Sequence, residues 1–206
     1  MKQNLTISFI FILILTAAAF GQNAPTASEY FERATALYNE GKYEQALTAL
    51  RQAEKLESAR FDIQSNIGTA LFILQRFGES SAAFLKAIKI NPQEASAHFN
   101  LCRSMAAEKK TSLAIPICQE AMRLNANREE YYVLLADIQR ANNQTEESFR
   151  ILLSAAEKFE SSVTVAGNLG DLYYQDGDLA RAHGSMRRRV GHGPARLLPD
   201  LCVGVR

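Results

Sequence analysis

The sequence predicts an all-α protein, a solenoid of antiparallel helix hairpins that repeat every 34 residues. Small residues recur at that interval, apolar residues between them are spaced three and four apart, and polar or helix-breaking residues separate the paired helices. Of the 206 residues, 47% are hydrophobic and 22% are charged, a composition typical of a globular protein and not of a disordered chain. The formal net charge of +1 gives no overall field that would favour nucleic acid.

The N-terminus has the three-part pattern of a secretion signal. Lys2 provides a positive start, residues 5–20 are almost all apolar and carry no charge, and Ala19 and Gly21 are small residues before a cleavage site. This apolar run is shorter than the roughly 20 residues that span a bilayer. We therefore predict that residues 1–21 are a cleaved signal peptide, followed by a short leader over residues 22–26, and that the protein is periplasmic or secreted. The alternative is an uncleaved N-terminal membrane anchor.

Three columns of small residues carry the repeat. Gly68 and Gly170 lie 102 residues apart, which is three times 34. We expect such residues where two helices cross closely, because a bulky side chain at the crossing would hold the helices apart. The columns hold Ala34, Gly68, Cys102, Ala136 and Gly170; Ala46, Ser80, Ala114, Ser148 and Ala182; and Ala53, Ala87, Ala121 and Ala155.

Apolar residues between these columns predict two amphipathic helices in each unit. Ile67, Leu101, Leu135 and Leu169 precede the first column, and Leu50, Phe84, Cys118 and Leu152 belong to the second helices. Three residues after the first column the chain has Leu37, Leu71, Met105 and Tyr173, with Gln139 as the exception. Polar or glycine-containing turns at 40–42, 142–144 and 176–178 separate the paired helices, and Pro92 ends the second unit.

This pattern resembles the tetratricopeptide repeat, with units at 27–60, 61–94, 95–128 and 129–162 and a partial unit at 163–182. The signature places are matched by Ala34, Gly41, Tyr43, Ala46 and Ala53 in the first unit, Gly68, Ala87 and Pro92 in the second, and Leu169, Gly170, Tyr173, Gly177 and Ala182 in the fifth. The resemblance implies a right-handed superhelical solenoid in which stability accumulates through contacts between neighbouring units. It identifies the fold and leaves the function open.

The pattern fails after Ala182, where a second helix is due. Glycine, proline and the consecutive arginines 187–189 replace the residues expected there. We interpret residues 183–206 as an aberrant or disordered tail, produced by a frameshift or a truncation; a genuine tail that binds an acidic partner through the arginines is the alternative. Without that helix, the end of the solenoid lacks a cap, and we expect fraying or self-association there.

No motif points to catalysis, a cofactor or a metal. His98 aligns with Tyr30 and Tyr132 of other units and is interpreted as a packing residue, whereas His183 and His192 fall in the aberrant tail. No His, Cys, Asp and Glu residues have zinc-like spacing, and no glycine-rich phosphate loop is present. We therefore expect neither an enzyme nor a bound cofactor.

Two cysteines predict a disulfide within the third unit. Cys102 is at the eighth place of that unit and Cys118 at the twenty-fourth, and these places lie opposite each other in a hairpin that turns near 108–110. An oxidising compartment would allow the bond; two buried thiols are the alternative. Pro116 lies inside the same second helix, and Cys202 has no partner of this kind.

The family resemblance implies that the first helices line a concave groove, which the second, fifth, sixth, ninth and twelfth places of each unit face. Their aromatic and amide side chains suit contact with an extended peptide, although the asparagines could simply bond to their own backbone. The candidates are Phe31, Thr35, Tyr38, Asn66, Thr69, Phe72, Phe99, Asn100, Arg103, Val133, Asp137, Arg140, Asn168, Asp171 and Tyr174.

These observations favour a protein- or peptide-binding scaffold in the cell envelope. One alternative is the recognition half of a longer enzyme, or of a secretion or envelope-assembly component, that has lost its downstream domain. Another is a purely structural spacer.

Overall fold

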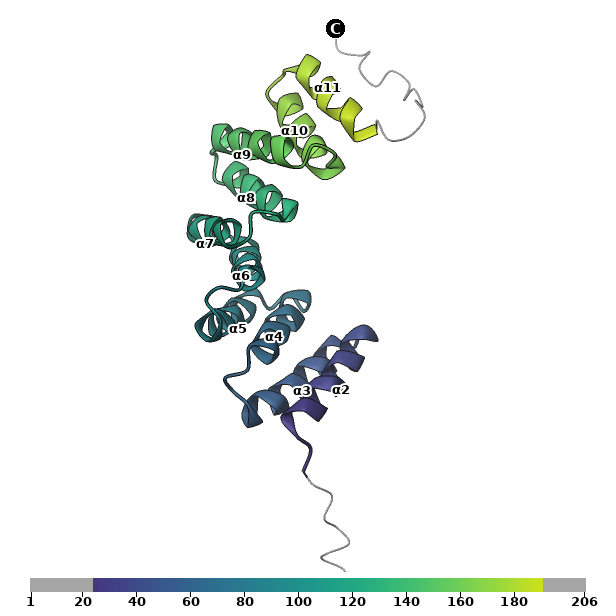
Figure 1. Ribbon diagram of the computed structural model, residues 1–206, viewed down its shortest axis with the longest axis vertical. Helices are drawn as coiled ribbons and strands as arrows, with labels where there is room; N and C mark the ends of the chain where they lie inside the picture. The colour runs from purple at the N-terminus through teal and green to yellow at the C-terminus, as the bar shows by residue number, and fades with distance from the viewer. Residues whose placement is uncertain (1–23, 191–206) are drawn as a thin grey trace, which may run out of the picture. The chain divides into compact units, whose positions relative to one another are not determined.

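A computed structural model describes residues 24–190, which contain helices and no strand (Figure 1). The predicted all-α fold, built from consecutive helix pairs, is confirmed. The helices are α2 (Ala27–Asn39), α3 (Tyr43–Leu56), α4 (Phe61–Ile73), α5 (Phe77–Ile90), α6 (Ala95–Ala107), α7 (Thr111–Leu124), α8 (Glu129–Ala141), α9 (Thr145–Lys158), α10 (Val163–Gln175) and α11 (Leu179–Val190).

The chain divides into two compact units at Ser58 and Ala59, so that α2 and α3 form the first unit and α4 to α11 form the second. Among the described residues, none of the helices is long and apolar enough to cross a membrane. The predicted signal peptide at 1–21 lies outside the described residues, as does the end of the predicted tail from residue 191. Both remain predictions.

The first unit is a single helix hairpin with a well-defined start. Thr26 and Glu29 form a capping box: the Glu29 amide donates to Thr26 Oγ1 (3.2 Å), and the Thr26 amide donates to Glu29 Oε2 (2.7 Å). These bonds satisfy amides that have no partner inside the helix. The turn into α3 passes through Gly41, whose φ of 75° lies in the left-handed region that glycine adopts without strain.

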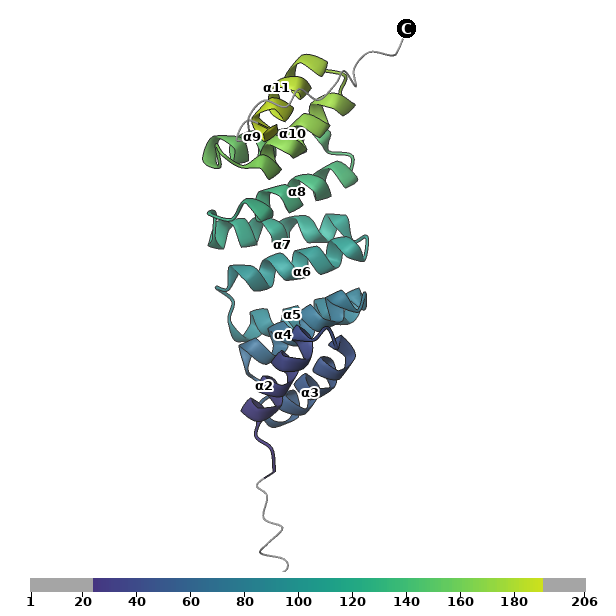
Figure 2. The ribbon, with the colours of Figure 1, turned by 90° about the vertical axis from the view of Figure 1, so that its right-hand side faces the viewer.

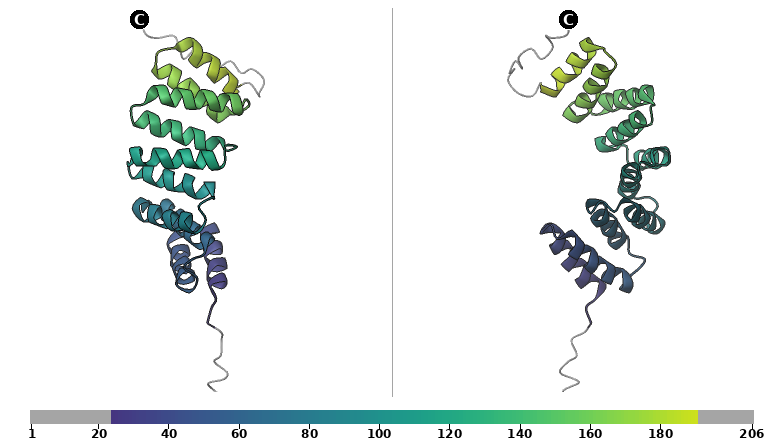
Figure 3. Two further views of the ribbon diagram at one scale, coloured as in Figure 1. Left: turned by 60° about the vertical axis from the view of Figure 1, so that its left-hand side comes forward. Right: turned by 180° about the vertical axis from the view of Figure 1, so that it is seen from behind.

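The second unit is a stack of four hairpins, α4–α5, α6–α7, α8–α9 and α10–α11. Neighbouring hairpins contact each other through α5 and α6, α7 and α8, and α9 and α10. Figure 2 and the left view of Figure 3 show helices α6 to α9 lying one above another. The first helices of these hairpins lie along one side of the stack, and α5, α7 and α9 lie along the other (Figure 1).

The small-residue columns lie where they were expected. All fourteen positions of the three columns are buried, from Ala34 to Ala182. At Gly68 the reason is close approach, because a Cβ atom added there would lie 2.8 Å from ring atoms of Phe84 on α5. Ser80 adds a buried polar contact to the same crossing: its Oγ donates to the Gly68 carbonyl (2.8 Å) and lies 2.9 Å from Ser104 Oγ on α6.

Three other hairpin turns use a residue other than glycine in the left-handed region. Gln75, Lys109 and Asn143 have φ angles of 59°, 62° and 61°, and each stands at the same place of its unit as Gly41 and Gly177. The left-handed conformation costs roughly 1–2 kcal/mol for residues that carry a Cβ atom. Asparagine adopts this conformation more readily than other residues with a Cβ atom, so it is at Gln75 and Lys109 that packing of the paired helices holds the turn against a local preference.

The predicted disulfide between Cys102 and Cys118 is present in the structure. It joins α6 to α7, with a distance of 5.4 Å between the two Cα atoms. Cys102 and Cys118 occupy the same two places of their hairpin as Gly68 and Phe84 do in theirs, so the covalent bond replaces a glycine–ring contact. Helix α7 contains Pro116 within its bounds, Thr111–Leu124.

The helix that was not expected after Ala182 is present. Helix α11 runs to Val190, so residues 183–190 are helical and not disordered, whereas the interpretation of the tail as the product of a frameshift or a truncation stays a prediction. Two features explain the difference: Asp178 Oδ1 accepts a bond from the Arg181 amide (3.0 Å) at the start of the helix, and arginine is a good helix former. Ala182 is buried, and α11 packs on α10. Helix α10 thus has the hairpin partner that it was expected to lack, whereas self-association at this end remains untested.

The Gly68 crossing gives a direct test of the fold. Gly68→Ala should lower the free energy of unfolding, because overpacking costs about 1–3 kcal/mol and the higher helix propensity of alanine offsets about 1 kcal/mol of that. Thermal and urea unfolding followed by circular dichroism measure the change. Gly78→Ala is the matched control: its added Cβ would lie 3.6 Å from the nearest atom, Glu108 Oε2, and it should stabilise the protein. A Gly68→Ala protein as stable as the parent would contradict close packing at this crossing.

The disulfide can be tested by alkylation in denaturant followed by mass measurement. In a Cys202→Ser background, no label should be added before reduction and two labels should be added after it. Reduction should also lower stability by roughly 3 kcal/mol, the value for a closed loop of about this length. Two labels before reduction would mean that Cys102 and Cys118 are buried thiols.

Candidate functional site

The surface formed by the first helices of the second unit is called here the first-helix face. It runs across α4, α6, α8 and α10, each of which contacts the next (Figure 1). The predicted binding residues of this unit lie on these helices: Asn66, Thr69 and Phe72 on α4; Phe99, Asn100 and Arg103 on α6; Val133, Asp137 and Arg140 on α8; and Asn168, Asp171 and Tyr174 on α10.

Phe72 and Arg103 come together from neighbouring first helices. The guanidinium carbon of Arg103 lies 4.0 Å from the centre of the Phe72 ring, and the ring also meets Phe77 edge-on at a centroid distance of 5.3 Å. A guanidinium over an aromatic face is attracted by the ring quadrupole. The pair therefore gives the face a fixed, partly buried surface that is both apolar and cationic.

Phe99 is half-buried and stacks on Tyr131, a residue that was not among the candidates. The two ring centroids are 4.6 Å apart with an angle of 25° between the planes. Tyr131 is only 4% exposed, and burial raises the pKa of its hydroxyl. Tyr131 therefore sets the position of Phe99 from the next first helix along. Tyr131 is the third residue of its unit, and the sequence analysis did not assign this place to the groove.

The asparagines of the first-helix face divide into two kinds. The side chains of Asn66 and Asn100 make no hydrogen bond within residues 24–190, and Asn66 is exposed while Asn100 is half-buried. Asn168 differs, because its Nδ2 donates to the Thr164 carbonyl of its own helix (2.9 Å). The Thr69 hydroxyl is also bonded within its own helix, because its Oγ1 donates to the Ser65 carbonyl (3.0 Å). Two carboxamides are thus available to a ligand.

The α8–α10 end of the face is acidic. Asp137 pairs with Arg140 at 2.9 Å, one turn along α8. Burial raises the pKa of the Asp137 carboxyl above its ordinary value; Arg140 lowers it, and the carboxylate of Asp171 on α10 raises it. The exposed Tyr174, which retains 60% of its accessible surface, lies one turn beyond Asp171. Because Arg140 offsets the charge of Asp137, these groups leave one net negative charge beside an exposed ring.

The candidates of the first unit lie on α2. Thr35 Oγ1 donates to the Phe31 carbonyl (3.0 Å), which occupies the hydroxyl within its own helix. The Tyr38 ring meets Tyr43 of α3 edge-on at a centroid distance of 5.2 Å, so that it packs within the hairpin. Phe31 remains partly exposed.

His98, the histidine within the repeats, packs inside the fold. His98 is 8% exposed and its Nε2 lies 2.9 Å from the Pro92 carbonyl, which agrees with its interpretation as a packing residue. Within the part of the chain that the structure describes, no three His, Cys, Asp or Glu side chains gather closely enough to hold a metal ion.

The sequence model of the tetratricopeptide repeat family matches residues 31–95. This match covers about a third of the chain, α2 to α5 and the start of α6, and identifies that stretch as tetratricopeptide repeats. A search of curated protein sequences gave no match. The matched family is one of repeat scaffolds and is not an enzymatic family.

Several solved structures share the fold. MamA from Desulfovibrio magneticus RS-1 aligns with a TM-score of 0.74 at 18% identity, covering 82% of this chain and 95% of that one. YrrB, described as a TPR protein with an unusual peptide-binding site, aligns with a TM-score of 0.67 at 19% identity, covering 88% and 93%. Pseudomonas aeruginosa pilF aligns with a TM-score of 0.70 at 16% identity, covering 82% and 78%. At these identities the likeness is one of fold.

The acidic end of the face predicts a specific titration. In Asp171→Asn, the pKa of Asp137 should fall because a repelling charge is removed; in Arg140→Gln it should rise because an attracting charge is removed. Carbon-detected NMR of the Asp137 carboxyl against pH measures both shifts. Asp176→Asn, in the turn after α10, is the control and should leave the value unchanged. Because the pKa is raised in the fold, the contribution of Asp137 to stability is present at low pH and is lost as the pH rises through the raised value. An Asp137 pKa at or below its ordinary value would contradict this account.

Proposed function

We propose that this tetratricopeptide repeat protein is an exported scaffold that binds an extended peptide, or an extended segment of a protein, on the first-helix face. The observation that carries the proposal is the pair of carboxamides of Asn66 and Asn100, which make no hydrogen bond within the described residues and lie on neighbouring helices with Phe72 and Phe99. A carboxamide offers a donor and an acceptor, which is what the backbone of an extended peptide requires.

The remaining side chains of the face indicate the ligand's chemistry. Phe72 and Phe99 are held by Arg103 and Tyr131, so that a ligand meets rigid apolar surface that costs little entropy to order. Towards α8 and α10 the carboxylates of Asp137 and Asp171 favour a basic group. We infer a peptide with an apolar side chain near α4 and α6 and a basic side chain near α8 and α10.

Export is supported by the N-terminal sequence and by the disulfide. The signal pattern of residues 1–21 lies outside the described residues, and the inference from it rests on sequence alone. A Cys102–Cys118 bond is typical of proteins that fold in an oxidising compartment. The fold adds support for binding, because YrrB has this fold and a peptide-binding site. The role is non-catalytic, in keeping with the repeat-scaffold family.

Peptides selected from a random library on the oxidised mature chain would test the proposal. Asn100→Ala should weaken the binding of the selected peptides roughly tenfold, about 1.4 kcal/mol, because two hydrogen bonds to the peptide backbone are lost. Asn168→Ala, at the same place of its unit, should have little effect because its carboxamide is already bonded to Thr164. Affinities are measured by calorimetry.

The native partner can be captured with a photo-crosslinking residue in place of Phe99. In cell envelopes of the source organism this position should yield a discrete adduct. The same residue in place of Ser154, which is exposed on the second helix α9, is the control and should yield none. Peptides that bind Asn100→Ala as tightly as the parent, together with equal adducts from positions 99 and 154, would rule out the first-helix face.

A further inference from the structure

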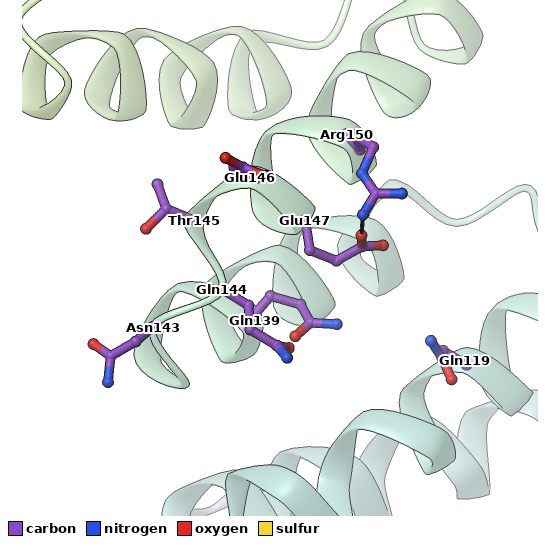
Figure 4. A pocket seen from close by; sticks show the side chains of 8 residues that line it. All are labelled: Gln119, Gln139, Asn143, Gln144, Thr145, Glu146, Glu147 and Arg150. Atoms are coloured by element: carbon purple, nitrogen blue, oxygen red, sulfur yellow. Dashed lines mark ion pairs between the residues drawn. The ribbon is translucent and has the colours of Figure 1, made fainter.

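A polar pocket of about 550 Å³ lies in the second unit, and none of the residues that line it is among the predicted binding residues of the first-helix face. It is bounded by α7, by the end of α8, which carries Gln139, by the turn between α8 and α9, and by the first turns of α9 (Figure 4). Gln139 and Gln144 lie close together on one side, the Glu147–Arg150 ion pair stands above them on α9, and Gln119 lies across the opening on α7. No aromatic ring lines the pocket.

Gln139 is the residue that singles out this pocket. Its place in the repeat is apolar in the four other units, which have Leu37, Leu71, Met105 and Tyr173. The side chain is 4% exposed, and its Oε1 has no hydrogen-bond partner. A buried acceptor without a partner costs stability that an apolar residue would not. A ligand that donates a hydrogen bond to this carboxamide would remove that cost.

The charge around Gln139 favours a cation. Two carboxylates, Glu146 and Glu147, and one guanidinium, Arg150, leave one net negative charge at the opening. Glu147 is paired with Arg150, whereas Glu146 makes no ion pair within residues 24–190. The carboxamide oxygens of Gln119 and Gln144 add neutral acceptors. The acceptors are thus spread around the opening and are not collected at one point.

We propose that this pocket binds a guanidinium group. A guanidinium is planar, carries five N–H donors, and is weakly hydrated, so that it can donate to several separated acceptors at once. In this arrangement Gln139 accepts at the floor, and Glu146 and Glu147 supply the opposite charge. The group belongs either to an arginine of a partner protein or to a small free molecule. This site shares helix α8 with the first-helix face but none of its predicted binding residues, and it does not rest on the function proposed for that face.

Binding of Nα-acetyl-arginine amide to the oxidised mature chain tests the site. Titration followed by the side-chain amide signals of Gln139 and Gln119 in NMR should show saturable binding. Gln139→Leu, which restores the apolar residue of the other units, and Glu147→Gln should each weaken binding at least tenfold. Glu79→Gln is the matched control: Glu79 stands at the same place of the second unit, pairs with Arg76 three residues before it, and lies outside the pocket. Binding to it should be unchanged.

Two further probes decide the chemistry and the source. Nα-acetyl-citrulline amide has the same shape without the charge and should not bind. Short peptides with a central arginine that bind more tightly than the amino-acid amide would identify a partner protein as the source, and equal affinity would identify a small molecule. Circular dichroism melts establish that each variant folds; should Gln139→Leu not fold, Glu146→Gln takes its place. The proposal is overturned if the arginine probe does not bind at millimolar concentration, if citrulline binds equally, or if Glu79→Gln loses binding to the same extent as Glu147→Gln.

Discussion

The contact between the eighth and the twenty-fourth residue of a unit is the constraint on which the rest of the structure depends. At Gly68 and Phe84 a ring lies directly against backbone, and at Cys102 and Cys118 a covalent bond spans the same gap. Both arrangements fix how closely the two helices of a hairpin approach. That distance decides which side chains are left on the surface of a hairpin to pack against the next one. It therefore also determines how far apart the first helices of neighbouring hairpins lie, and Phe72 and Arg103 meet across that separation.

The features that depend on how closely two helix backbones approach each other could be predicted from the sequence. Small residues are the ones that allow two helices to touch, so their interval of 34 residues identified the hairpins, the turn positions and the facing cysteines. Gln75 and Lys109 show the limit of local signals, since neither residue type favours the left-handed conformation that each adopts. There the hairpin's packing overrides the preference of the residue.

The features that depend on neighbouring side chains could not be predicted in this way. Whether an asparagine is available or occupied depends on its rotamer: Asn100 and Asn168 share a place in the repeat, and only Asn168 bonds to its own helix. Tyr131 supports Phe99 from an adjacent hairpin, which a reading of one helix at a time does not show. The helix after Ala182 was missed because its arginines were weighed as foreign to the repeat and not as helix formers.

The bond between α6 and α7 also bears on the order in which the chain assembles. In a repeat array each hairpin is marginal until a neighbour covers it, and folding begins wherever a first hairpin holds together. A hairpin closed by a covalent link keeps its two helices near each other even when its packing is lost, because its loop remains closed. Oxidation of Cys102 and Cys118 would thus make the third repeat a lasting nucleus, onto which α4–α5 and α8–α9 could add from either side.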